Sequence, residues 1–260
     1  MPPHAIQLPR NATGARFPAI CAPLVGRTAQ RLLDEVAVVA AKKPDILEWR
    51  VDFFEGIADT ASMADLCGRI KAASGGIPLL VTRRSAREGG ERIELTEAQV
   101  IALYAAVCRT GHVDLLDYEA GNAPAEVAEV REMTRAHRVQ LLLSFHDFQS
   151  TPAVEAIADR FARAAQLGAD IAKVAVMPRS MEDVLRLLEA TQRASRELAI
   201  PVVSMSMGRL GAITRLCGWA FGSAMTFAIG ESPSAPGQMA IEDVGAGLAL
   251  LQKALRPDDL

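Results

Sequence analysis

The chain has 260 residues, a formal net charge of −3 and a charged fraction of 23%. This balance does not produce the broad basic field that nucleic-acid binding requires, and two Trp and two Tyr offer little surface for stacking on bases. Hydrophobic residues make up 50% of the chain, so its composition and length favour one sizeable core, within the range of a single α/β barrel.

The N-terminal sequence MPPHAIQLPR lacks the apolar stretch of a secretion signal, and no apolar run reaches the roughly 20 residues that span a bilayer. We therefore expect a cytoplasmic protein that does not associate with a membrane. The four cysteines, Cys21, Cys67, Cys108 and Cys217, are widely spaced and form no CxxC pair. This spacing favours buried thiols over a zinc site or a disulfide framework.

Short apolar runs alternate with longer amphipathic ones along the whole chain. The short runs are continuous in Val, Ile, Leu and Met, which is typical of strands that are buried on both faces of a parallel sheet. The predicted strands are Phe17–Leu24, Ile46–Phe53, Pro78–Arg83, Val113–Tyr118, Val139–Phe145, Asp170–Met177, Pro201–Met207 and Ala224–Ile229.

Helix signals lie between these runs. Thr96 and Gln99 have the spacing of a capping box, and Thr151-Pro152 predicts a second helix start. Eight strand–helix units at intervals of roughly thirty residues predict one (β/α)8 barrel, a TIM barrel, over residues 1–260. A doubly wound open sheet is the structural alternative, although no break in the pattern favours it. Residues 5–16 are predicted to form a short β-hairpin that covers the barrel floor.

In this fold the C-terminal ends of the strands hold the reacting groups, so polar residues there are site candidates. Lys173 lies in the apolar run IAKVAV, where desolvation favours the uncharged, nucleophilic amine; the alternative is a lysine that reaches solvent from a strand end. His146 stands where the fifth run ends, and the other three histidines do not lie at such a position. It is therefore a candidate general acid/base.

Charged residues also gather near the second predicted strand. Glu48, Arg50 and Asp52 alternate along it, so they are expected to share one face. Three charges on one face of a central strand are costly in a plain core. They are predicted either to bind a substrate or to form a structural layer of ion pairs.

The segments after the third strand and within the fourth are also charged. The third runs into a loop with paired glycines, a weak signal alone, which contains Arg83, Arg84, Arg87 and Glu88. The fourth contains acidic residues without metal-ligand spacing, for which a structural or supporting role is predicted: Asp114, Asp117 and Glu119.

Polar residues follow the last two strands. Arg215 comes after the seventh, and its guanidinium fork matches a carboxylate. Ser234 and Gln238 lie in the Ser/Pro/Gly-rich loop after the eighth, where a polyol contact or an ordinary connection are both compatible with the composition. The sequence shows no P-loop, no dinucleotide-binding motif and no Ser-His-Asp order. The whole pattern predicts Schiff-base chemistry on a small, oxygen-rich anion.

Six segments of the chain resemble the type I 3-dehydroquinate dehydratases of aromatic amino-acid biosynthesis by the shikimate pathway. They occur in the same order over nearly the whole chain, and the family fold is an α/β barrel. The segments are EWRVDFF at 48–54, TRRSAREGGE at 82–91, SFHDF at 144–148, AKVAVMP at 172–178, TRLCGWAFGSAMTF at 214–227 and SAPGQM at 234–239.

The resemblance implies a lyase that converts 3-dehydroquinate to 3-dehydroshikimate plus water. It implies that Lys173 forms the imine with the substrate ketone, that His146 is the general acid/base and that Glu88 orients His146. It further implies substrate contacts by Glu48, Arg50 and Arg84 near the hydroxyls, Arg215 at the carboxylate, Ser234 and Gln238 in the last loop, and Met207 and Phe227 as apolar walls. No metal or organic cofactor is expected, and the family implies a homodimer.

Two positions depart from the family pattern and leave details of the pocket open. Pro23 stands where some members have a ligand-contacting Ser, and Arg83 stands where another residue is common. Two other functions remain as alternatives: another class I, Schiff-base aldolase-like barrel enzyme, which would cleave a C–C bond, and a non-catalytic dehydroquinate-binding module. The presence of both Lys173 and His146 favours an enzyme over a binding module.

Overall fold

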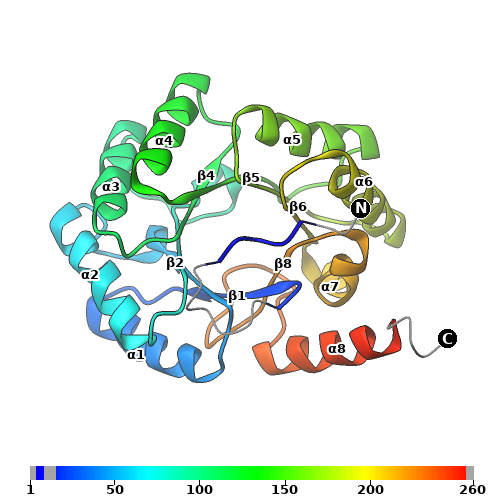
Figure 1. Cartoon of the computed structure of the whole chain (residues 1–260), viewed down its shortest axis with the longest axis horizontal. Helices are drawn as coiled ribbons and strands as arrows, with labels where there is room; N and C mark the ends of the chain where they lie inside the picture. Colours follow the sequence, from blue (N-terminus) through cyan, green and yellow to red (C-terminus); the bar gives the residue numbers. More distant parts are fainter. Residues whose placement is uncertain (1–3, 9–15, 256–260) are drawn as a thin grey trace.

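The computed structural model describes residues 4–8 and 16–255, and Figure 1 shows its central strands surrounded by helices. Within these residues eight strands form one parallel sheet. The strands are β1 Ala19–Leu24, β2 Ile46–Arg50, β3 Leu79–Thr82, β4 Leu115–Glu119, β5 Gln140–Asp147, β6 Ile171–Val176, β7 Val202–Ser206 and β8 Met225–Phe227.

A helix follows each strand and packs on the outside of the sheet. The helices are α1 Ala29–Ala41, α2 Thr60–Ala73, α3 Glu97–Arg109, α4 Pro124–His137, α5 Val154–Gln166, α6 Met181–Glu197, α7 Gly208–Cys217 and α8 Ile241–Ala254. Three short 3₁₀ turns in the described ranges are Val51–Phe53, Ala86–Glu88 and Gly218–Phe221.

The strand order shows that the sheet is a barrel. Neighbours follow the chain from β1 to β7, and β8 pairs with β1. A parallel bridge between Val202 and Ser223, with a 2.8 Å hydrogen bond from Ala224 N to Val202 O, joins β7 to the segment that leads into β8. The predicted (β/α)8 barrel is therefore confirmed, and the doubly wound alternative is wrong.

Side chains alternate between the barrel interior and the helices, because successive residues of a strand point to opposite faces. The lower interior is apolar and contains Ile46, Leu80, Leu115, Leu142, Ile171 and Val203. Two positions further along β2 to β6, the residues on the same face are polar: Glu48, Thr82, Asp117, Ser144 and Lys173. An apolar layer thus lies directly beneath a layer of ionisable and hydroxyl groups.

The N-terminal segment covers the floor of the barrel. Ile6 is buried against the lower interior cluster, and the side-chain amide of Gln140 donates a hydrogen bond to the carbonyl of Gln7. In Figure 1 this segment crosses the ring of strands. Residues 4–8 form no strand, and positions 9–15 of the expected hairpin lie outside the described residues.

The strand ends differ from the sequence predictions by at most two residues, apart from the second strand, which ends three residues earlier than predicted. The second strand ends at Arg50, and Val51–Phe53 form a 3₁₀ turn, so Asp52 lies beyond the strand. Thr96 and Gln99 make the predicted capping box of α3. The helix expected to begin at Pro152 begins at Val154 instead, after an extended Ala153.

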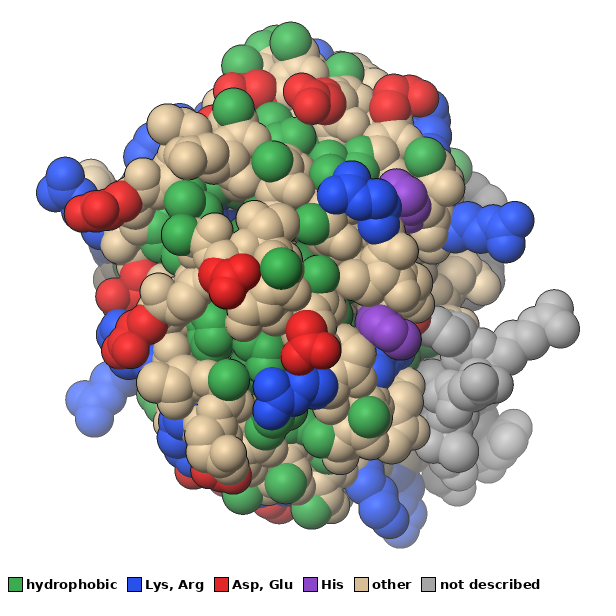
Figure 2. Space-filling model, turned by 90° about the vertical axis from the view of Figure 1, so that its left-hand side faces the viewer, with side chains coloured by type: hydrophobic (Ala, Val, Ile, Leu, Met, Phe, Trp, Pro, Cys, Tyr) green, Lys and Arg blue, Asp and Glu red, His purple; other side chains and the backbone are tan. Residues whose placement is uncertain are grey.

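Charges of both signs are interspersed on the outer face of the molecule that Figure 2 shows, with apolar side chains between them. No continuous basic patch is seen among the described side chains on this face. No helix in residues 4–8 and 16–255 combines the length and apolar character needed to cross a membrane.

The apolar layer beneath the polar one yields a first prediction. Ile171→Ala removes a fully buried side chain from this layer, so the free energy of unfolding should fall by about 2–5 kcal/mol. Urea unfolding followed by circular dichroism measures the loss. A loss below about 1 kcal/mol would mean that the site collapses onto the missing atoms and that the layer is not tightly packed.

Candidate active site

A pocket of about 460 Å³ opens at the C-terminal ends of the strands. The structure brings together in its lining all the residues that the sequence analysis proposed for the site: Glu48, Arg50, Arg84, Glu88, His146, Lys173, Met207, Arg215, Phe227, Ser234 and Gln238. They come from six strands, from the loops after them and, for Arg215, from helix α7, so the barrel fold makes them neighbours.

Lys173 points from β6 into this pocket, and its side chain is only 5% exposed. Its Nζ lies 3.4 Å from Oδ2 of Asp117 and 4.3 Å from the centroid of the Phe227 ring. The carboxylate and the aromatic face both stabilise a cation where water is largely excluded. Lys173 is therefore a buried strand residue, and its amine does not reach bulk solvent.

Asp117 of β4 is fully buried and pairs with two cations. Its Oδ2 lies 2.7 Å from Nη2 of Arg84, and its Oδ1 accepts a 2.7 Å hydrogen bond from the hydroxyl of Ser144. Arg84 in turn donates from Nη1 to the same hydroxyl at 2.8 Å. Burial alone would raise the pKa of Asp117, but Arg84, Lys173 and Ser144 outweigh it and lower the pKa below its usual value. Asp117 is thus a stable counter-ion.

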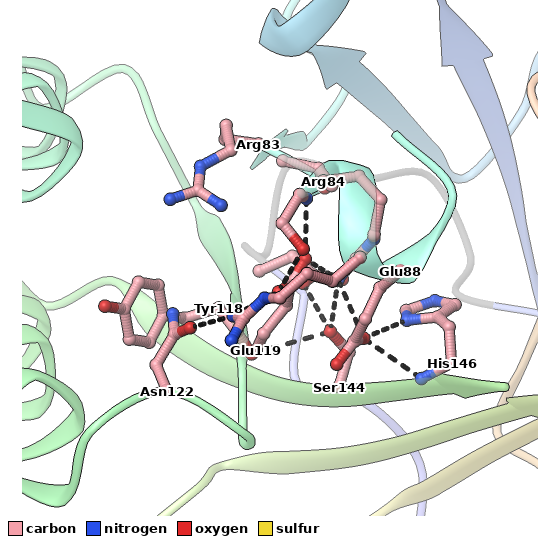
Figure 3. Close-up of polar contacts among 12 residues, drawn as sticks. Arg83, Arg84, Glu88, Tyr118, Glu119, Asn122, Ser144 and His146 are labelled. Atoms are coloured by element: carbon pink, nitrogen blue, oxygen red, sulfur yellow. Dashed lines mark hydrogen bonds and ion pairs between the residues drawn. The ribbon is translucent and has the colours of Figure 1, made fainter. Parts of the chain in front are cut away.

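His146 and Glu88 form the second polar group of the pocket (Figure 3). Oε2 of Glu88 lies 2.9 Å from Nδ1 of His146 and accepts a 3.0 Å hydrogen bond from the His146 backbone N–H. This contact fixes the ring and leaves Nε2 as the other ring nitrogen for a ligand.

The two partners have shifted pKa values. Burial, followed by the cations Arg84, Lys173 and Arg50, lowers the pKa of His146 well below its usual value. Burial and then the neighbouring Glu119 carboxylate raise the pKa of Glu88 to about 8, against the opposing effect of Arg84. The raised pKa of Glu88 and the lowered pKa of His146 therefore both favour protonation of the carboxyl group over protonation of the imidazole.

The charged residues near β2 include an ion pair, Arg50–Asp52, and two residues that line the pocket, Glu48 and Arg50. Glu48 accepts a 2.9 Å hydrogen bond from the hydroxyl of Thr82 and lines the pocket. Arg50 also lines it, and its Nε and Nη2 donate to Asp52 at 2.9 and 2.7 Å. Asp52 does not share the strand face as expected, because the chain turns at Val51, yet it still pairs with Arg50.

Arg215 of α7 is 2% exposed and differs from the other cations of the pocket. Its Nη1 and Nη2 donate at 3.1 Å to the carbonyl oxygens of Phe227 and Pro236. Its Nε has no hydrogen-bond partner, and no carboxylate in the described part of the chain pairs with it. Burial lowers its pKa to about 10. The site thus contains a buried guanidinium without a counter-anion.

The loop after β8 closes one side of the pocket. Ser234 N–H donates to Oε1 of Gln238 at 2.9 Å, and Nη1 of Arg50 reaches the Ser234 carbonyl at 3.4 Å. Gly237 has φ 76° and lies so close to Gly208 that a Cβ atom would clash with its carbonyl. The loop is therefore held against both β2 and the start of α7.

Five further residues line the pocket that the sequence analysis did not name: Gly89, Phe148, Ala175, Met205 and Ala235. Ala175 and Met205 lie on the interior faces of β6 and β7, so the alternation from Lys173 and Met207 was the signal that could have identified them. Gly89, at φ 83°, lies against the ring of Phe148, and no local pattern predicts this contact between two loops.

Arg83 and Pro23, the two positions that depart from the family pattern, both lie outside the pocket lining, at different places in the fold. Arg83 points outward and pairs with Glu97 of α3, and Figure 3 shows it directed away from Arg84. Its identity therefore does not affect the pocket lining. Pro23 lies beside Glu48 in the β1–β2 register but is not among the lining residues.

In the described ranges, no group of three or more His, Cys, Asp or Glu side chains is arranged to hold a metal ion. The pocket instead combines a buried amine, an imidazole with a carboxyl partner, and an unpaired guanidinium. Such groups are able to form an imine, to move a proton and to bind a carboxylate.

The chain is similar to a known family of proteins in both sequence and structure. A family model for Type I 3-dehydroquinase matches residues 20–254. The 3-dehydroquinate dehydratase of Albidiferax ferrireducens is 57% identical over 242 residues, which cover 93% of this chain and 92% of that protein. The crystal structure of 3-dehydroquinate dehydratase from Geobacillus kaustophilus has a TM-score of 0.89 at 51% identity, covering 92% of this chain and 93% of that one. The type I enzyme from Clostridium difficile, whose structure holds covalently modified comenic acid, has a TM-score of 0.89 at 38% identity, with 93% and 95% covered.

The lowered pKa of His146 yields a second prediction. The pKa of His146 in the folded protein lies below the unfolded value of about 6.5, so the folded protein binds a proton on the imidazole less tightly than the unfolded protein does. The stability that the neutral ring contributes is therefore present above about pH 6.5 and is lost as the pH falls through the folded-state pKa. At about pH 6 the ring should still be neutral in folded protein and mostly protonated in urea-unfolded protein. Nitrogen-15 NMR of labelled histidine measures both. A folded His146 that titrates at or above 6.5 would contradict the electrostatic environment described.

Proposed function

This chain belongs to the type I 3-dehydroquinase family, and we propose that it removes water from 3-dehydroquinate to give 3-dehydroshikimate through an imine on Lys173. The observation that supports it most directly is the buried Arg215 guanidinium without a carboxylate partner, in the same pocket as Lys173 and His146. In a small substrate that has both a ketone and a carboxylate, the ketone can react with Lys173 while the carboxylate pairs with Arg215. The C. difficile relative with covalently modified comenic acid supports covalent chemistry in this family.

The reaction begins at Lys173. Its neutral amine attacks the ketone carbon, the carbonyl oxygen leaves as water, and a C=N bond forms. The protonated imine withdraws electrons more strongly than the ketone, so a proton on the adjacent carbon becomes acidic enough to remove near neutral pH. Phe227 and Asp117, beside Nζ, stabilise the positive charge of the iminium.

His146 moves the protons. When Glu88 is ionised, Nδ1–H donates to it and Nε2 is free to take the proton from the substrate carbon. The pair then holds one extra proton, which Nε2 returns to the departing hydroxyl as water leaves. The elevated pKa of Glu88 supports its role as the partner that stores this proton. Hydrolysis of the imine restores the amine and releases the product.

The remaining groups position the substrate. Arg215 binds the carboxylate, while Glu48, Arg50 and Arg84 lie where the hydroxyls of a polyol ring would be held. Ser234 and Gln238 close over the ligand, with Met207 and Phe227 as apolar walls. The chemistry proposed requires no metal or organic cofactor. A homodimer and a cytoplasmic location remain predictions.

Replacement of the nucleophile tests the imine. Lys173→Ala should abolish turnover while the circular dichroism spectrum stays that of the wild type, because no other amine among the described pocket-lining residues is placed to attack the ketone. After borohydride reduction with 3-dehydroquinate, wild-type protein should gain a ligand adduct on the Lys173 peptide by mass spectrometry, and the variant should gain none.

The same measurement separates the alternatives. Folded wild-type protein that turns over 3-dehydroquinate without forming an adduct would contradict the imine mechanism but not the dehydratase activity. Protein that binds the compound without turnover would indicate a binding module. A borohydride adduct that forms with aldehyde or ketone substrates of aldolases, together with cleavage of a C–C bond, would indicate an aldolase-like enzyme.

Replacement of the general acid/base separates imine formation from proton transfer. His146→Ala should slow turnover roughly 10²–10⁴-fold, because a positioned acid/base commonly contributes that much. The borohydride adduct should still form, since Lys173 is intact. A rate like that of the wild type, measured by product absorbance, would remove His146 from the mechanism.

A further inference from the structure

Glu88 reaches His146 from a short turn, Ala86–Glu88, and not from a strand. Strand residues such as Lys173 are fixed by the sheet ladder on both sides, whereas a 3₁₀ turn in a loop has no ladder. The 2.9 Å contact between Glu88 and His146 therefore needs other interactions to hold the turn in place.

The turn is organised around Ser85. The Ser85 carbonyl accepts hydrogen bonds from Glu88 N–H at 3.0 Å and from Gly90 N–H at 2.9 Å. The other polar groups of Ser85 both point to Glu119: its backbone N–H donates to Oε1 and its hydroxyl donates to Oε2, each at 2.7 Å. Both oxygens of one carboxylate thus bind the residue to which the turn is tied.

Glu119 is well placed for such a role. It is the last residue of β4, is 1% exposed and is not among the residues that line the pocket. Its remaining partners, Nη1 of Arg84 and Nη2 of Arg87 at 3.4 Å each, belong to the same loop. All side-chain contacts recorded for Glu119 within the described residues therefore go to positions 84, 85 and 87.

We infer that Glu119 is a positioning residue, which holds Ser85 and through it sets the Glu88 carboxyl against His146. This inference rests on the proposed function, because it assigns a support for the same acid/base pair. The carboxylate of Glu119 also acts on Glu88 through space. The charged and titratable groups around Glu88 are Arg84 in its own loop, Glu119 and Asp117 of β4 and His146 of β5, and among these Glu119 contributes most to raising the pKa of Glu88.

Two substitutions separate contact from charge. Glu119→Ala removes the acceptors of Ser85, so kcat should fall roughly 10- to 100-fold, as expected when a catalytic group is misplaced by about 1 Å. KM should change little, because Arg215 and Gln238 are untouched and Arg84 keeps its closer contacts with Asp117 and Ser144. Glu119→Gln keeps an acceptor for the Ser85 N–H and should retain most of kcat, but the acid limb of the kcat/KM profile should move to lower pH, because the pKa of Glu88 falls without the neighbouring charge.

Glu35 supplies a matched control. It is also 1% exposed, and its Oε2 accepts backbone hydrogen bonds from Val25 and Gly26 at 2.9 and 2.8 Å in the loop after β1, away from His146. Glu35→Ala should cost stability yet leave kcat and the pH profile unchanged. The inference would be overturned if Glu119→Ala kept the kcat and the pH profile of the wild type. It would also be overturned if Glu35→Ala lowered kcat as much as Glu119→Ala does.

Two further measurements make the result decisive. If Glu119→Ala does not fold, Ser85→Ala, which removes only the hydroxyl contact, should still lower kcat with KM unchanged, and wild-type kcat would count against the inference. Histidine NMR without substrate should show a changed His146 ring environment in Glu119→Ala but not in Glu35→Ala. If the wild-type protein is inactive on 3-dehydroquinate, the proposed function is wrong, but the inference on Glu119 is not thereby contradicted. The NMR comparison would still test whether Glu119 positions His146 and Glu88.

Discussion

Burial of cations inside a barrel requires negative charge at the same depth, and Asp117 provides it. Its carboxylate contacts Arg84 at 2.7 Å and Lys173 at 3.4 Å, and it is fully buried. Removal of ionised groups from water costs several kcal/mol each, which only close pairing and further hydrogen bonds offset. Because Asp117 lies nearer to Arg84, the Lys173 amine is less tightly held than the guanidinium. In the proposed reaction, this asymmetry leaves the amine able to reach the substrate ketone while the charge of the site stays balanced.

The same reasoning explains why Arg215 stands apart. Arg50 has Asp52 and Arg84 has Asp117, so each brings its own carboxylate into the interior. Arg215 has only carbonyl partners, and burial lowers its pKa to about 10. An incoming carboxylate gains most at the cation that has no counter-ion, since the paired ones would first have to release theirs. In the proposed function, charge pairing in the protein thus directs the substrate carboxylate to the Arg215 end of the pocket.

How much the sequence predicts depends on whether a contact is local. The apolar run around Lys173 and the position of His146 at the end of a run single out both residues, and the unbroken apolar runs predict the parallel sheet. The family resemblance names Glu88 and Arg215, which no periodicity identifies. The sequence predicts a structural or supporting role for Asp117 without identifying its partners, and it predicts strand where Val51–Phe53 form a 3₁₀ turn. These depend on how distant segments meet, which composition and spacing along one segment do not encode.

The two halves of the proposed acid/base pair are held with unequal rigidity. His146 belongs to β5, which pairs with β4 and β6 and sits above the close-packed apolar layer of the barrel. Glu88 belongs to a loop whose fixed points are two buried carboxylates: Asp52, which accepts the backbone N–H groups of Arg84 at 3.3 Å and Glu91 at 3.0 Å, and Glu119, which holds Ser85 between them. A catalytic contact of 2.9 Å tolerates little displacement of either partner. In the proposed mechanism, buried carboxylates that do not line the pocket therefore hold in place the groups that act on the substrate, and Asp52 does so while it also pairs with Arg50.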